Sequence, residues 1–187
     1  MEQNSLWVNC SYKNSRDKMC GDIKELYISI QLVRKMVKDS KNIERNREAQ
    51  LPQAATSEKL LALLSPRSIA VVGASDKRKK LGGRILRHLR RHGYEGDIWP
   101  VNPSHDMIEG LPCYPSVATL PGVPDLGLVV LTPEASVSAV EALAAQGAKA
   151  CAVLASGFNE IGPHGALLER RMAIAAQQHG MLLLGPN

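Results

Sequence analysis

Residues 69–75 have the sequence Ile69-Ala70-Val71-Val72-Gly73-Ala74-Ser75, an aliphatic run that ends abruptly in small residues. Four later apolar runs also end in turn-forming residues, namely Asn102-Pro103, Thr132-Pro133, Ser156-Gly157-Phe158 and Gly185-Pro186-Asn187. Short aliphatic runs that alternate with helical stretches are typical of parallel strands buried on both faces. In an open parallel sheet, ligands bind outside the carboxyl ends of the strands. We therefore expect these five turns along one edge of a sheet, which we call the rim.

The hydrophobic periodicity predicts an α/β, Rossmann-like fold, with a five-stranded parallel sheet in the order 3-2-1-4-5 and helices on both faces. The expected strands lie at residues 68–73, 97–101, 126–131, 149–155 and 181–184. The expected helices lie at residues 57–64, 82–92, 133–146 and 165–178, the first of them capped by Ser57. Residues 57–187 are therefore predicted to form one domain.

Residues 1–56 differ from the rest and are predicted to be an extension with one amphipathic helix at 22–39 and a polar linker from Ser40 onward. The apolar residues that recur at helical spacing are Ile23, Leu26, Tyr27, Ile30, Val33, Met36 and Val37. The opposite face carries both signs of charge, which favours packing on a partner or on the main domain over a membrane surface.

The composition is that of a soluble globular protein, with 44% hydrophobic and 22% charged residues among 187. No apolar stretch approaches the roughly 18 residues that span a bilayer, and no secretory signal precedes the domain. The four cysteines are scattered without metal-ligand spacing, and the five histidines are dispersed. We expect a cytoplasmic protein with reduced thiols, no metal, no membrane association and no catalytic constellation.

The net charge of +5 is concentrated just after the first strand, in Lys77, Arg78, Lys79, Lys80, Arg84, Arg87, Arg90 and Arg91. Such a cluster can be a solvated helix face, but here it starts where a phosphate-bearing ligand would lie. Nucleic acid is disfavoured as a partner because there is one Phe and no nucleic-acid-binding motif.

Gly73-Ala74-Ser75 and the pair Gly82 and Gly83 form either a phosphate-binding turn or an ordinary tight turn. Their spacing is too long for the GxGxxG motif of NAD sites. Asn102-Pro103 stands where NAD-binding proteins carry an acidic residue for the ribose. Ser104 and His105 would tolerate a phosphorylated ribose, so NADP or coenzyme A is favoured over NAD.

The remaining rim motifs each allow two interpretations. Asn102-Pro103 and Thr132-Pro133 are either plain turns or the walls of a slot for an adenine ring. Phe158, the one Phe of the chain, either forms a wall of the site or fills the core beneath the loop. Glu160 is the carboxylate beside a rim loop and a candidate secondary contact. Asp125 precedes a strand at the other edge and is expected to be structural.

Several motifs match one family in order and spacing: 66–75 (PRSIAVVGAS), 80–83 (KLGG), 101–103 (VNP), 110–117 (GLPCYPSV), 156–160 (SGFNE) and 185–187 (GPN). From about residue 58 to 187 the chain closely resembles the N-terminal CoA-binding domain of NDP-forming (ADP-forming) acyl-CoA synthetases. These enzymes are related to the succinyl-CoA synthetase alpha chain, and some are fused to a GNAT protein acetyltransferase.

The resemblance implies a role for each rim motif. The CoA phosphates would lie on Gly73, Ala74, Ser75, Gly82 and Gly83, and the adenosine between Val101, Asn102, Pro103, Thr132 and Pro133. The pantetheine would run along Ser156, Gly157 and Phe158. The family often carries Lys after Val-Asn-Pro, where this chain has Ser104, so the 3′-phosphate contact either comes from Lys80 or Arg84 or is weaker.

Family members continue past Gly-Pro-Asn into a part with a phosphohistidine and then an ATP-grasp module. We therefore expect this chain to bind CoA or acyl-CoA without catalysing the ligase reaction alone, as a domain truncated before those parts, with the remaining synthetase domains or subunit as partners. Two alternatives stay open: an NADP- or NAD-binding oxidoreductase domain, and a CoA-sensing regulatory or interaction protein.

Overall fold

The computed structural model describes residues 53–186 of the chain. The helix expected at residues 22–39 lies outside the described residues. The described helices are α2 (Gln53–Leu64), α3 (Leu81–Arg91), α4 (Pro133–Ala145), α5 (Pro163–Gln178) and the short 3-10 turns η1 (Val117–Thr119) and η2 (Asn159–Ile161). The described strands are β1 (Ser68–Val72), β2 (Asp97–Val101), β3 (Met107–Ile108), β4 (Leu111–Pro112), β5 (Leu126–Val129), β6 (Ala150–Val153) and β7 (Leu182–Leu184).

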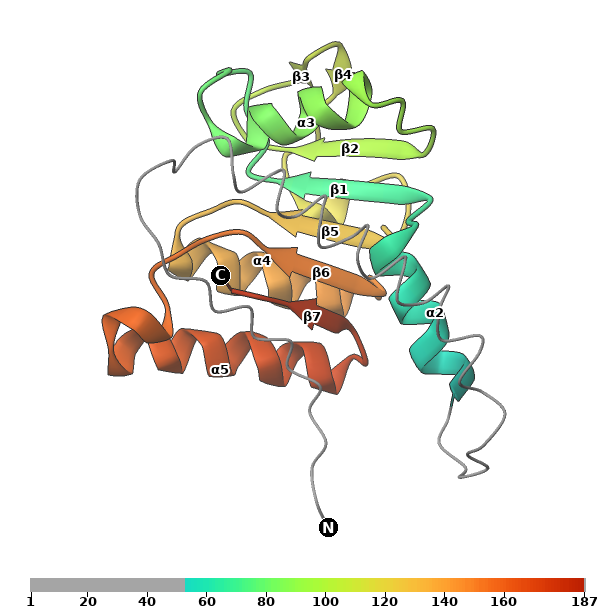
Figure 1. Ribbon diagram of the computed structural model, residues 1–187. Coiled ribbons are helices and arrows are strands. Elements are labelled where there is room, and N and C mark those ends of the chain that lie inside the picture. The colour runs from blue at the N-terminus through green and yellow to red at the C-terminus, as the bar shows by residue number, and fades with distance from the viewer. Residues whose placement is uncertain (1–52, 187) are drawn as a thin grey trace.

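The central sheet has five parallel strands in the order β2-β1-β5-β6-β7 (Figure 1). Counting only these five strands along the chain, the order is 2-1-3-4-5. The expected α/β, Rossmann-like fold with five parallel strands and helices on both faces is confirmed, but the order 3-2-1-4-5 is wrong.

Pro100 explains why β2 lies at the edge of the sheet. A proline cannot donate a ladder hydrogen bond and is therefore restricted to edge strands or bulges. Pro100 pairs with Val71 of β1 on one side. On the other side its carbonyl accepts a hydrogen bond from the Tyr114 N–H at 2.9 Å, so the position without an N–H faces the open edge. The chain then crosses back over β1 to form β5, through the β3–β4 hairpin and η1.

Each face of the sheet has its own apolar core. On one face, Val129 and Val153 of the sheet pack with Leu143 of α4, Met172 of α5 and Phe158, all nearly inaccessible. The other face packs the remaining inward residues of the strands against α2 and α3, for which Ala62, Ile85 and Leu86 are the contacts. Figure 1 shows α4 behind the sheet, α3 beside β2, and α2 at the end where the strands begin.

The helix boundaries follow the expected ones closely except at the first helix. Helix α2 begins at Gln53, so Ser57 lies inside it and is not its cap. The residues Gln53-Ala54-Ala55 favour helix, in agreement with a helix that already includes them. The expected domain boundary after residue 56 therefore falls within α2. Among residues 53–186, helices of the length and apolarity needed to cross a bilayer are not found.

Asp125 anchors the edge of the sheet opposite the rim. Its carboxylate accepts hydrogen bonds from the Arg67 backbone N–H at 3.0 Å and the Arg67 side chain at 3.2 Å, and pairs with Lys149 at 3.2 Å. Burial alone would raise the pKa of this carboxyl, but the bonds from Arg67 and Lys149 outweigh burial and lower the pKa. The expected structural role of Asp125 is consistent with this geometry.

Candidate functional site

The loop after β1 is held at the rim by backbone contacts with both neighbouring strands. Gly73 has a φ of +90°, a conformation that glycine adopts readily. The amides of Gly73 and Ala74 donate to the Val101 carbonyl at 3.0 and 3.3 Å. A Cβ on Gly73 would lie 2.4 Å from the Val130 carbonyl oxygen. The first part of the loop therefore fills the space between β2 and β5.

The side chains of this loop point away from solvent until residue 76. Ala74 is fully buried, and Ser75 is 6% exposed with its hydroxyl accepting a hydrogen bond from the Lys77 N–H at 3.2 Å. The Ser75 hydroxyl is therefore turned inward, where it shapes the turn. The residues that the loop presents to solvent are the charged ones, Asp76 and 77–80.

The glycine pair at the start of α3 is needed for packing between the helix and the loop. A Cβ on Gly82 would lie 2.2 Å from the Gly73 carbonyl oxygen, and one on Gly83 would lie 2.5 Å from the Ser75 carbonyl oxygen. Both glycines are buried against that backbone. They bring the first turn of α3 close against the β1 loop.

The first turn of α3 is suited to binding an anion. The N-cap residue Lys80 has extended backbone and makes no side-chain capping bond, and no acidic residue lies in the first turn. The amides of a first helical turn carry partial positive charge. Four exposed cations, residues 77–80, lie immediately beside it. Amides and ammonium groups together favour a phosphate-bearing ligand at this position.

The basic residues between Lys77 and Arg91 divide into two groups with different surroundings. The Arg87 guanidinium pairs with the Glu109 carboxylate at 3.0 Å and donates to the Arg78 carbonyl at 2.6 Å. Arg90 donates to the Glu109 carbonyl. Burial is the main cause that lowers the pKa of His88, and the charges of its basic neighbours add to it. The second half of the run therefore holds the β3–β4 hairpin, while residues 77–80 are exposed beside the first turn of α3.

Asn102 ties the turn after β2 to the loop after β1. Its side-chain N–H donates to the Ala74 carbonyl at 2.7 Å, and its side-chain oxygen accepts from the Ser104 N–H at 2.9 Å. Val101 is buried, whereas Pro103 is exposed. The side chain of Asn102 is thus engaged in holding the turn, and Pro103 is the part of this motif that a ligand can reach.

A second contact, which the sequence did not indicate, also joins the loop after β1 to the turn after β2. The His105 imidazole Nε2 lies 3.6 Å from the Asp76 carboxylate. Its Nδ1 is buried without a hydrogen-bond partner. Asp76 is the one acidic residue among the cations of the β1 loop, but no spacing in the sequence connects it with His105.

The turns after β5 and β6 also meet. Thr132 is exposed and is the N-cap of α4 with no side-chain capping bond, and Pro133 is the first helical residue. Gly157 has a φ of +102°, and a Cβ there would lie 2.8 Å from Pro133 Cγ. Ser156 is exposed beside it. The two turns therefore form a continuous stretch of rim.

Phe158 lies in the core and does not form a wall of the site. Its side chain is fully buried within the cluster of α4 and α5. Gly165 leaves room for this arrangement, because a Cβ there would overlap the Phe158 carbonyl. Of the two interpretations of Phe158, the packing one holds. The exposed Ser156 and the backbone of Gly157 remain available to line the rim.

Glu160 binds the amides of this loop with its own carboxylate. It accepts hydrogen bonds from the Gly157 N–H and from the Phe158 N–H, the latter at 3.0 Å. The bond from Gly157 is the largest cause that lowers the pKa of the Glu160 carboxyl, helped by the amides of Glu160 and Phe158. Glu160 therefore fixes the conformation of the loop, a role different from the expected secondary ligand contact.

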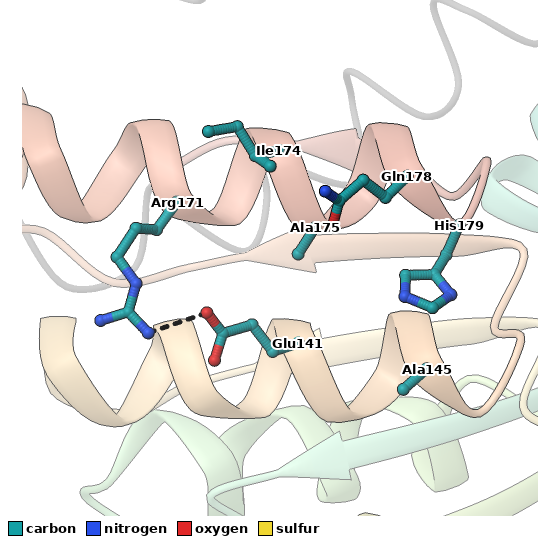
Figure 2. Close-up of a pocket in the computed structure, with 7 residues that line it drawn as sticks. All are labelled: Glu141, Ala145, Arg171, Ile174, Ala175, Gln178 and His179. Carbon is teal, nitrogen blue, oxygen red and sulfur yellow. Dashed lines mark hydrogen bonds and ion pairs between the residues drawn. The ribbon is translucent and has the colours of Figure 1, made fainter.

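Two clefts in the structure lie away from the rim. One, of about 470 Å³, lies between α4 and α5 and contains the Glu141–Arg171 ion pair at 2.9 Å (Figure 2). The other, of about 420 Å³, lies beside the β2 edge and is lined in part by Trp99 and Tyr114. Neither includes a predicted site residue. Within residues 53–186, no group of three His, Cys, Asp or Glu side chains is placed to hold a metal ion.

Comparison with known proteins agrees with this geometry. Residues 67–187 match the model of a CoA binding domain. Acetate–CoA ligase [ADP-forming] II of Archaeoglobus fulgidus is 38% identical over 125 residues, which are 67% of this chain and 19% of that protein. The alpha subunit of acetate–CoA ligase [ADP-forming] I of Pyrococcus furiosus is 36% identical over 132 residues, 68% of this chain and 29% of the subunit.

A solved structure extends the similarity to three dimensions. The dinucleotide-forming acetyl-coenzyme A synthetase 1 of Ca. Korarchaeum cryptofilum, in complex with phosphate and ADP, matches with a TM-score of 0.66 and 36% identity over 70% of this chain. The match covers 28% of that chain. This chain thus spans less than a third of the length of each of these relatives. It belongs to the CoA-binding domain family, and its domain is similar to that of ADP-forming acyl-CoA synthetases.

Proposed function

We propose that this chain binds coenzyme A or an acyl-CoA at the rim, as the CoA-binding part of an ADP-forming acyl-CoA synthetase of the acetate–CoA ligase type. The observation that carries the proposal is the uncapped, acid-free first turn of α3 beside four exposed cations at the carboxyl ends of the strands. Family membership identifies the anion that such a site would hold.

Each part of CoA would lie on a different turn. The diphosphate would receive hydrogen bonds from the first amides of α3 and charge from residues 77–80. The exposed ring of Pro103 and the Thr132-Pro133 turn would flank the adenine. The backbone of Ser156 and Gly157 would lie along the pantetheine. The 3′-phosphate would be bound by Lys80 or Arg84.

The chain's share of the reaction would be to hold and orient CoA. Bound CoA supplies a thiol that can carry an acyl group as a thioester, and the residues described here position that thiol. Because the relatives are much longer, we propose that further synthetase domains or a subunit carry out the phosphoryl transfer and present the acyl group.

Parallel calorimetric titrations with CoA, 3′-dephospho-CoA and NADPH test the proposal. CoA should bind most tightly, and removal of its 3′-phosphate should weaken binding. Lys80→Ala should weaken CoA binding about 5- to 30-fold, the loss of about 1–2 kcal/mol for one charged contact to phosphate. Arg91→Ala, at the far end of the same helix, is the matched control and should leave it unchanged.

The outcomes separate the alternatives. Preference for NADPH would favour the oxidoreductase interpretation, and binding of none of the three would refute a CoA site. Equal binding of CoA and its dephospho form would show that neither Lys80 nor Arg84 contacts the 3′-phosphate.

A further inference from the structure

One face of the sheet is incompletely covered over β5, β6 and β7. Four apolar side chains on this face are only partly buried: Val130, Leu154, Leu182 and Leu184. Leu182 and Leu184 lie in β7, and Val130 and Leu154 directly follow β5 and β6, which end side by side at the paired residues Val129 and Val153. We call these four residues the open patch.

The topology explains why crossover helices leave this face open. Helices α4 and α5, which connect β5 to β6 and β6 to β7, both pack on the other face with Phe158. Helix α3 packs on β1, and α2 reaches β6 and β7. In Figure 1, α2 covers β6 and β7 only where these strands begin. A parallel sheet is normally covered on both faces, so the open patch calls for a further element.

We propose that residues 22–39 of this same chain pack as an amphipathic helix on the open patch. The segment carries apolar residues at positions 23, 26, 27, 30, 33, 36 and 37, which would form one stripe along a helix. A helix of this length is marginal in water by itself and gains most of its stability from burying such a stripe. Segment and patch are therefore complementary in chemistry.

The length of chain before α2, and the place where it enters the structure, fit this arrangement. The chain enters at Gln53, and α2 contacts β6, which ends next to Leu154, and β7, which contains Leu182 and Leu184. Residues 40–52 can span about 40 Å when extended, more than enough to return to the patch. A helix over residues 22–39 is about 27 Å long, which suffices to cross three strands spaced about 4.8 Å apart.

Hydrogen exchange measured by mass spectrometry on the full chain tests the proposal. In the wild-type protein, amides of residues 22–39 should be protected at least tenfold over an unstructured peptide. Ile30→Asp, on the apolar stripe, should abolish that protection and speed exchange at residues 182–184. Gln31→Asp, on the polar face one residue away, is the matched control and should change neither.

A second pair of variants tests the receiving surface. Leu184→Ser should release residues 22–39, whereas Leu167→Ser, at an exposed apolar position on α5, should not. If Leu184→Ser fails to fold, as judged by circular dichroism, the response of residues 182–184 to Ile30→Asp decides the question.

Three results would overturn the proposal. They are exchange of residues 22–39 at peptide rates, protection that Leu184→Ser leaves intact, and protection that depends on protein concentration, which would mean that a second copy covers the patch. None of these readouts involves CoA, so the proposal stands or falls independently of the proposed function.

Discussion

The close approach between α3 and the β1 loop predicts that Gly82→Ala destabilises the protein. In an open helix this substitution would stabilise by up to about 1 kcal/mol, because alanine favours helix and glycine does not. Here the new Cβ would lie 2.2 Å from the Gly73 carbonyl oxygen, 3.0 Å from its carbon and 3.1 Å from Ala74 Cα. All three are backbone atoms, so no side chain can rotate to relieve the overlap.

The size of the effect follows from the displacement required. Ordinary contact begins near 3.4 Å, so the start of α3 must move by about 1 Å, and overpacking of this kind costs about 1–3 kcal/mol. That loss should lower the melting temperature by about 3–10 °C in a domain of this size. Because the same movement displaces the first turn of α3 from the rim, CoA binding should weaken together with stability.

Urea unfolding, monitored by circular dichroism, measures the loss of stability in Gly82→Ala, and Gly122→Ala is the control. A Cβ on Gly122 would meet only Trp99 Cη2, at an ordinary 3.4 Å, so that variant should stay within about 0.5 kcal/mol of wild type. Unchanged or increased stability of Gly82→Ala would contradict the packing described here. The pair of glycines would then have to be explained by direct approach of a ligand.

Three further predictions concern single side chains. Asp125→Asn should lower the free energy of unfolding by about 1–3 kcal/mol near neutral pH. Because the folded-state pKa of Asp125 is lowered, its contribution to stability is present above about pH 4 and is lost as the pH falls through the folded pKa, so the variant should lose less stability on acidification than the wild type. Glu58→Gln, which changes the exposed partner of Lys149, should have a smaller effect. Glu160→Ala should speed hydrogen exchange of the Gly157 amide about fivefold, as expected for a lost bond of about 1 kcal/mol; unchanged exchange would contradict that bond. Burial raises the pKa of Cys151 to about 12, so this thiol should react with iodoacetamide at pH 8 only after unfolding.

The sequence predicted the strands and helices well because each has a strong local signal, but the strand order depends on a single residue. The expected order placed the strand of Pro100 between two others. Proline is compatible only with an edge there, and the structure places β2 at the edge, paired with β1 on one side. This signal was present in the sequence and argued against a central position for that strand.

Phe158 shows a different limit on what can be predicted from the sequence. A bulky ring next to a glycine turn is compatible with either the surface or the core, and its direction depends on distant residues. In the fold, Gly165 of α5 leaves space for the Phe158 backbone, and the ring enters the cluster of α4 and α5. No local pattern contains that contact. Asn102 and Ser75 were both expected as polar rim groups, but a tertiary hydrogen bond to the Ala74 carbonyl engages Asn102, and a local one from the Lys77 N–H engages Ser75.

The basic run from Lys77 to Arg91 carries the sharpest consequence for function. In the sequence it is one block of positive charge, and its position after the first strand favours binding of a phosphate-bearing ligand. In the structure Arg87 and Arg90 are bound to Glu109, which lies 22 residues beyond Arg87 and joins α3 to the β3–β4 hairpin. The exposed charge beside the first turn of α3 is therefore that of residues 77–80, with the Asp76–His105 pair next to it. Neutralising a cation of this group should act on CoA affinity, whereas truncating Arg87 should act on stability, because it leaves the partly buried Glu109 carboxylate without its partner.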